Sequence, residues 1–164
     1  MEKIIFIAVP IAAVVHIIEE YVCPGGFAGA FNKLLPRASH LFTQRFHIVV
    51  NGVFILLCLI STIIGKTNLV ISLSIFGLIF TNAILHIRGA FIQKGYYPGV
   101  LSAVFIYIPL TIIAYTLFIT SKQLTWMQAG LSFILGVMYM GILMVYVLTH
   151  QRSNTNNESK TSNR

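Results

Sequence analysis

A histidine and two adjacent glutamates lie near the end of the first apolar stretch of the chain. The stretch ends VHIIEEY and contains His16, Glu19 and Glu20. On an α-helix His16 and Glu20 are four residues apart and share a face, while Glu19 lies three residues from His16 on the other flank. Carboxylates in an apolar helix are costly unless a cation compensates their charge. These three residues therefore predict a metal-ligating or catalytic site.

Two further polar pairs have the same spacing of four residues. His47 and Asn51 open a later apolar stretch, and Asn82 and His86 lie toward the end of another. Each pair presents two polar groups on one helical face. Such a face turns inward in a membrane bundle, because lipid would leave its polar groups without hydrogen bonds.

The composition is that of an integral membrane protein. Of the 164 residues 57% are hydrophobic and 9% are charged, whereas about a quarter of the residues of a soluble domain are charged. The net charge of +7 comes from basic residues between the apolar stretches. We attribute this charge to orientation in the membrane rather than to nucleic-acid binding. The two cysteines define neither a disulfide framework nor a zinc motif.

The apolar stretches predict an all-α, polytopic membrane bundle of five transmembrane helices. A spanning helix needs about 20 apolar residues, and the expected helices are at about residues 4–23, 46–64, 69–92, 99–120 and 124–149. They form one domain, residues 1–150, and the polar residues 151–164 predict a disordered tail. The connection 24–45 mixes apolar and basic residues, so we expect it on the membrane surface, where it either covers the site or only anchors the chain.

Basic residues predict the orientation of these helices. Eight of the eleven Lys and Arg residues fall on the side that holds the end of the first helix, and three fall on the other side. Basic residues are in excess on the cytoplasmic side of membrane proteins. We therefore expect a multi-pass protein of the cytoplasmic membrane, with its N-terminus outside and its C-terminus in the cytoplasm.

Antiparallel helices bring the polar residues to one depth. The helix ends that meet in the cytoplasmic leaflet carry eight candidate site residues: His16, Glu19, Glu20, His47, Asn51, Asn82, His86 and Tyr97. Polar residues at matching depth on several helices indicate one shared site rather than scattered packing.

A metal ion would explain this set of residue types. Imidazole and carboxylate are usual ligands of zinc and iron. The predicted cofactor is a divalent metal, zinc or iron, with one ion favoured and two not excluded. The predicted ligands are His16, Glu19, Glu20, His47 and His86. One of the two catalytic glutamates, Glu19 or Glu20, would act as the base, and Asn51, Asn82 and Tyr97 would orient the ligands. The alternative is salt-bridged packing of the glutamates against Arg45 or Arg88.

Three functions fit such a site. The first is a membrane-embedded, metal-dependent enzyme that hydrolyses or oxidises a lipid or other apolar molecule from the cytoplasmic leaflet. The second is a protein that transports or binds a metal ion or a proton. The third is a haem protein with His47 and His86 as axial ligands. The sequence leaves a homo-oligomer open.

The residues 16–20, read as H-x-x-E-E on the first helix, resemble the bacterial HXXEE-motif family of small membrane proteins. The Asn82 and His86 pair and the Tyr97-Pro98-Gly99 turn look like further parts of that pattern. The resemblance covers about residues 10–105. It implies a bacterial membrane protein with His16, Glu19 and Glu20 in its site, and it implies no particular reaction.

Overall fold

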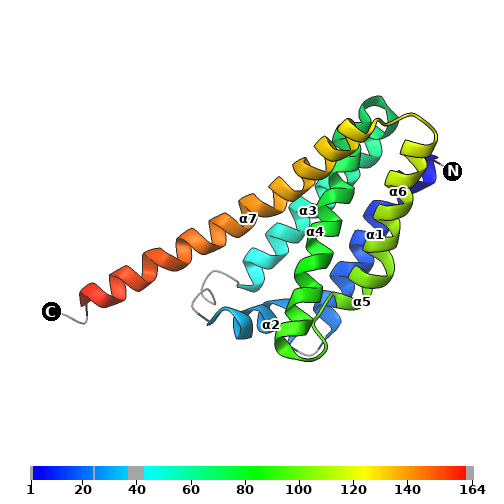
Figure 1. Cartoon of the computed structure of the whole chain (residues 1–164). Helices are drawn as coiled ribbons and strands as arrows, with labels where there is room; N and C mark the ends of the chain where they lie inside the picture. Colours follow the sequence, from blue (N-terminus) through cyan, green and yellow to red (C-terminus); the bar gives the residue numbers. More distant parts are fainter. Residues whose placement is uncertain (1, 24, 37–42, 162–164) are drawn as a thin grey trace.

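The structure, a computed structural model, describes residues 2–23, 25–36 and 43–161. Figure 1 shows a bundle of long helices: α1 (Glu2–Val22), α3 (Gln44–Ile64), α4 (Leu69–Gln93), α6 (Ile108–Thr120) and α7 (Trp126–Thr161). Four short elements connect them: α2 (Gly26–Leu34), η2 (Gly65–Asn68), α5 (Val100–Ser102) and η3 (Ala103–Tyr107). The described ranges contain no strand, so the prediction of an all-α fold is confirmed.

Four helical stretches among the described residues are long and apolar enough to cross a membrane: Glu2–Val22, Gln44–Gln93, Val100–Thr120 and Trp126–Tyr146. The count is four, not the predicted five, because α3, η2 and α4 form one apolar stretch of 50 residues. The chain folds back at η2, so α3 and α4 lie side by side (Figure 1). The hydroxyl of Ser61 donates to the carbonyl oxygen of Ser72 at 2.9 Å across this turn.

Side-chain caps begin the two helices of this hairpin. The Thr43 hydroxyl accepts a hydrogen bond from the Phe46 N–H, and the Asn68 side chain accepts one from the Ile71 N–H. Each cap satisfies a backbone donor that has no partner inside its own helix. The caps therefore fix where α3 and α4 start, and with them the depth of the polar residues on each helix.

Helix α1 continues through Pro10. Proline has no N–H, so the carbonyl oxygen of Phe6, four residues earlier, loses its helical partner. The Thr62 hydroxyl of α3 donates to this oxygen at 2.7 Å. A polar residue of a neighbouring helix thus satisfies the freed carbonyl inside the apolar bundle, as a membrane environment requires.

Helices α4 and α7 approach closely through glycine. A Cβ atom added to Gly77 of α4 would lie 2.9 Å from the carbonyl oxygen of Phe133 of α7, and Gly136 faces the α4 backbone in return. Small residues allow this backbone-to-backbone packing in membrane helices. The contact holds α7 on α4.

The C-terminal part of α7 differs from the sequence prediction. The backbone of residues 151–161 continues the helix, whereas we expected this polar segment to be disordered. Helical hydrogen bonds are local to the segment, so a helix can project beyond the bundle without tertiary packing. Figure 1 shows the end of α7 extending away from the other helices.

The end of the bundle near α2 holds the polar residues. Helix α1 ends there, α3 begins there, α4 ends there and α5 begins there (Figure 1). At the opposite end Glu2 forms an ion pair with Lys66 and accepts a hydrogen bond from Gln123. These contacts tie α1 to η2 and to the connection between α6 and α7.

Candidate metal centre

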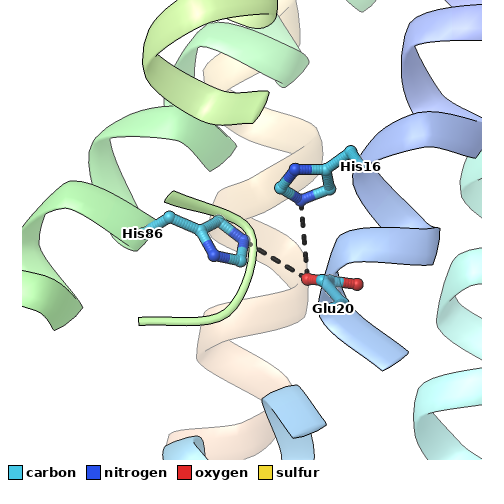
Figure 2. A group of neighbouring side chains, drawn as sticks. All are labelled: His16, Glu20 and His86. Atoms are coloured by element: carbon cyan, nitrogen blue, oxygen red, sulfur yellow. Dashed lines mark ion pairs between the residues drawn. The ribbon is translucent and has the colours of Figure 1, made fainter. Parts of the chain in front are cut away.

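Glu20 is the centre of the cluster. Its side chain is buried, with 4% of the residue exposed. Its Oε1 atom lies 3.5 Å from Nε2 of His16 and 3.3 Å from Nε2 of His86, which reach it from α1 and α4 (Figure 2). Its Oε2 atom lies 3.1 Å from Nε2 of His47 and accepts a hydrogen bond from the Asn51 amide at 3.1 Å. One carboxylate therefore has imidazole nitrogens from three helices around it.

The chain fixes the proton of His86. Its Nδ1 atom lies 2.6 Å from the carbonyl oxygen of Pro98. A carbonyl oxygen only accepts, so Nδ1 carries the hydrogen. In the neutral ring Nε2 then has a lone pair, and that lone pair faces Glu20. A second hydrogen-bond partner on the other ring nitrogen is the usual arrangement of a metal-ligating histidine.

A relay of hydrogen bonds fixes the proton of His16 in the same way. The hydroxyl of Ser102 has one hydrogen, and its shorter contact, 2.5 Å, is with Oε2 of Glu19, to which it donates. The Nδ1 atom of His16, 2.8 Å from this hydroxyl, must therefore donate to it. The Nε2 atom of His16 is left with a lone pair, which faces the Asn82 amide at 3.0 Å and Glu20.

The proton positions on His16 and His86 indicate whether the cluster suits a cation. Two nitrogen lone pairs and a carboxylate oxygen converge, and the ligand atoms of His16, Glu20 and His86 all lie within 4.8 Å of one another. The Asn82 amide donates to Nε2 of His16, and one proton would join Glu20 to only one imidazole, whereas a cation would bind all three atoms. Ligand atoms about 2.0–2.1 Å from a tetrahedral zinc are about 3.3 Å apart, close to the observed nitrogen–oxygen distances. These three residues could hold a metal ion.

Glu19 has a different position from the one that we predicted. Its carboxylate accepts hydrogen bonds from the Tyr96 hydroxyl and from the backbone N–H groups of Leu101 and Ser102, at 2.7, 3.0 and 2.7 Å. The two N–H groups belong to the first turn after Gly99, where a carboxylate is stabilising. Glu19 thus holds the start of α5 and the Ser102 hydroxyl, and this hydroxyl connects it to His16 of the cluster.

His47 completes the cluster from α3 between two aromatic rings. Tyr21 and Phe27 stack on its imidazole, with ring centroids 5.0 and 5.1 Å away. Its Nε2 atom contacts one carboxylate oxygen of Glu20, and His86 contacts the other. The carboxylate therefore occupies the space in which the haem iron of the third hypothesis would lie, and the structure gives that hypothesis no support.

Helix α2 covers the site, which was one of the two alternatives for residues 24–45. The Phe27 ring also lies 5.1 Å from the His86 ring and 5.8 Å from the Tyr97 ring. Tyr97 is buried, with 2% of the residue exposed, and contacts His86 edge to face. Burial raises the pKa of its phenol, and the negative charge of Glu20 adds to the effect. The phenol is therefore a neutral hydrogen-bond donor at physiological pH.

A cavity of about 660 Å³ borders the cluster. Glu20 and the three histidines contribute polar atoms to its wall, together with Asn51 and Asn82. Most of the remaining wall is apolar and comes from four helices: Phe27, Phe31 and Leu34 of α2 and Leu35 at its end, Val50 and Leu57 of α3, Leu78 and Leu85 of α4, and Met140 and Leu143 of α7. An apolar cavity with a few converging polar groups is the usual form of a small-molecule site.

The structure brings together most of the predicted site residues. His16, Glu20, His47, His86 and the two asparagines share hydrogen bonds or ion-pair contacts, and Tyr97 packs against His86. The described ion pairs include none between either glutamate and an arginine, so the salt-bridge alternative with Arg45 or Arg88 has no support. Arg88 is exposed and lines the cavity.

Sequence reasoning missed the residues that act through the backbone and through packing. They are Ser102, the Pro98 carbonyl, Gly99, Tyr21 and Phe27. A Cβ atom at Gly99 (φ +88°) would lie 2.6 Å from Nδ1 of His86 and 2.8 Å from Cε1 of His16. Only glycine lets both rings pack on this turn. The Tyr97-Pro98-Gly99 sequence was the available signal, since it predicts a tight turn beside the site.

Replacing Ser102 with alanine is expected to weaken metal binding about 10–100-fold, as changes to groups that orient metal ligands do. The change removes the acceptor that orients Nδ1 of His16, while the three ligand atoms stay. Competition with a chromophoric chelator measures the affinity of the purified protein. Ser74→Ala is the matched control, because the Ser74 hydroxyl donates only within its own helix. Equal affinities in both variants would show that the relay has no influence on the ligand.

The fold and the cluster define a class of protein, namely a membrane helix bundle with a buried histidine–glutamate centre that could hold a metal. The sequence model of one family, described as a protein of unknown function with HXXEE motif, matches residues 7–114. The chain belongs to this HXXEE family. None of the curated proteins and none of the solved structures compared with the chain matches it.

Proposed function

We propose that the chain is a membrane-embedded, metal-dependent enzyme that acts on a lipid or another apolar molecule. One observation carries the proposal: the lone pairs of His16 and His86 converge on the buried Glu20 carboxylate at the wall of a largely apolar cavity. A buried carboxylate with too few hydrogen-bond donors around it costs folding free energy, so we infer that a bound partner compensates its charge. A catalytic cation would be such a partner.

Each residue of the cluster has a part in the proposed chemistry. His16, Glu20 and His86 hold one divalent cation, zinc or iron; with a single carboxylate in the cluster, a second ion has little support. When bound, the cation supplies a Lewis acid for hydrolysis or a redox centre for oxidation. His47 lies 3.1 Å from Glu20 and can accept or donate a proton beside it. Phe27 and α2 keep water away from the cluster.

Metal removal and restoration test the proposal. Purified protein is incubated with a lipid extract, and the products are identified by mass spectrometry. We expect product formation to stop after chelation, to return with zinc for a hydrolase or with iron for an oxidase, and to fall at least 100-fold in His86→Ala. Glu2→Gln, changed at the opposite end of the bundle, is the control. Unchanged product formation by the stripped protein would contradict the proposal.

Transport of a metal ion or proton, the second hypothesis, has less support. The buried histidines and the buried glutamate that the structure describes gather at one end, next to α2. Toward the other end, the buried polar residues are hydroxyls such as Ser61, Ser72 and Thr111. A conducting path would need further ion-binding groups there.

The membrane topology is also a proposal. Helices α3 and α4 have 21 and 25 residues, each enough for one crossing, so we propose that the chain crosses a bacterial cytoplasmic membrane five times. The excess of basic residues then places the N-terminus outside and the site in the cytoplasmic leaflet. Cysteine labelling from each side at Lys66 and Lys94 tests this topology. Opposite accessibility of the two positions is expected, and equal accessibility would contradict it.

A further inference from the structure

The cavity beside the cluster is open toward the side of the bundle. Its wall includes Val49 and Val53 of α3 and Tyr139 of α7, whose exposed fractions are 63, 52 and 37%. These residues lie in apolar helices that could span a membrane. A ligand would therefore enter between α3 and α7 from the lipid, not from water.

The cavity extends along helix α4. Its wall follows α4 from Leu78 to Ile92, about 21 Å of helix at 1.5 Å per residue. That length exceeds half of a hydrocarbon core of about 30 Å. A volume of about 660 Å³ is within the range of pockets that enclose one small ligand. The length and the volume of the cavity fit one extended chain.

Arg88 adds a positive charge to the cavity wall and takes no part in the ion pairs of the cluster. Among the described lining residues it is the only Lys or Arg, and Glu20 is the only acid. Arg88 is exposed and has no ion pair in the part of the chain that the structure describes. Guanidinium groups pair with carboxylate and phosphate in two-pronged geometry.

A second unused donor lines the same cavity. The hydroxyl of the buried Tyr97 makes no hydrogen bond with other described residues, although the residue is only 2% exposed. Because Tyr97 lines the cavity and its hydroxyl has no partner among the described residues, this hydroxyl can donate to a ligand there. With a divalent cation at the cluster, the formal charges of the cation, Glu20 and Arg88 sum to +2. The cavity then favours an anion.

We propose that this cavity binds a single-chain amphiphile with an oxyanion head group, a carboxylate or a phosphate, whose head binds to Arg88. The Tyr97 hydroxyl is the second donor to the head, and the chain lies against α3, α4 and α7. As the substrate class of the proposed enzyme, this ligand rests on the proposed function. The binding itself does not, because Arg88 is no part of the metal cluster.

Competition among head groups tests the proposal. Purified protein in a non-ionic detergent is mixed with equal amounts of four ligands that share a 16-carbon chain: the carboxylate, the phosphate monoester, the alcohol and the trimethylammonium. Native mass spectrometry measures the bound fraction of each, with and without zinc. We expect the carboxylate or the phosphate to bind at least 10-fold better than the alcohol, the effect of one charge-assisted contact.

Variants then assign the preference to Arg88. Arg88→Gln is expected to reduce the preference to less than 3-fold, while Lys94→Gln, a change to a basic residue outside the cavity wall, keeps it. Leu143→Trp fills the cavity and is expected to reduce binding of all four ligands. Equal binding of the carboxylate and the alcohol by the unchanged protein would overturn the proposal. So would an unaltered preference in Arg88→Gln or displacement of all four ligands by two-chain phospholipid alone.

The same data separate this proposal from the proposed function. Preference for the anion in the zinc-free protein, together with no turnover in any metal form, would retain the amphiphile site and reject the enzyme. Turnover of uncharged lipids without any anion preference would reject the amphiphile site and retain the enzyme.

Discussion

Glu20→Gln is expected to abolish metal binding, whereas Glu19→Gln is expected to retain it. Glutamine has the size of glutamate but no charge, so the variant loses the carboxylate that faces the lone pairs of His16 and His86. We expect about one metal per chain in the unchanged protein and less than a tenth of that in Glu20→Gln. Elemental analysis after gel filtration gives the ratio.

Stability measurements on the same two variants add an independent readout. A metal at 1,000 times its Kd stabilises a protein by about 4 kcal/mol, so zinc should raise the Tm of the unchanged protein and of Glu19→Gln, but not that of Glu20→Gln. Glu19→Gln also loses charge-assisted bonds to Leu101 and Ser102. It should therefore be destabilised by about 1–3 kcal/mol in both metal states. Equal metal contents in the two variants would contradict the different positions of these glutamates.

Gly99→Ala is expected to lose the metal site and much of the stability at this end of the bundle. Two effects combine at Gly99. Its φ of +88° is strained for alanine, which costs about 1–2 kcal/mol. The added Cβ atom would also lie 2.6 Å from the His86 ring and 2.8 Å from the His16 ring, so both rings must move. Overpacking of this kind costs a further 1–3 kcal/mol or so.

Gly25→Ala separates these two effects. Gly25 has a similar φ of +81°, but a Cβ atom there would have no neighbour within 4 Å. The variant should therefore have only the backbone cost and should bind metal normally. Thermal unfolding and metal content of both variants provide the comparison. Normal metal binding in Gly99→Ala would contradict the packing of the two imidazoles on this turn.

The position of the cluster could be predicted because helices obey simple rules. The length of an apolar stretch sets where each helix ends, and a spacing of four residues puts His16 with Glu20, and His47 with Asn51, on one face. Antiparallel helices then bring these faces to one depth. The grouping of His16, Glu20, His47 and His86 follows from these rules alone.

The different positions of the two glutamates could not be predicted from spacing. Adjacent residues on a helix point about 100° apart, so only one of Glu19 and Glu20 can face the cluster. The choice depends on where the first turn of α5 lies, and that turn depends on Gly99 and Pro98. Turn geometry and side-chain relays such as that of Ser102 are set by tertiary contacts, which helical periodicity does not report.

Apolar composition alone also does not give the number of spanning helices. Only the short segment η2 separates α3 from α4, so by composition the two helices form one apolar stretch of 50 residues. The fold-back at Gly65 (φ +48°) and the Asn68 cap separate the two helices. This turn fills the gap between the expected helices 46–64 and 69–92, but it does not interrupt the apolar composition.

X-ray absorption spectroscopy of the zinc-loaded protein tests the central claim most directly. The account predicts about one zinc per chain, with nitrogen and oxygen ligands about 2.0–2.1 Å away and outer-atom scattering from at least two imidazoles. His86→Ala should remove one imidazole from the spectrum. A coordination sphere without imidazole, or no zinc above the level in Glu20→Gln, would contradict the claim and leave the cluster as a proton-linked ion pair.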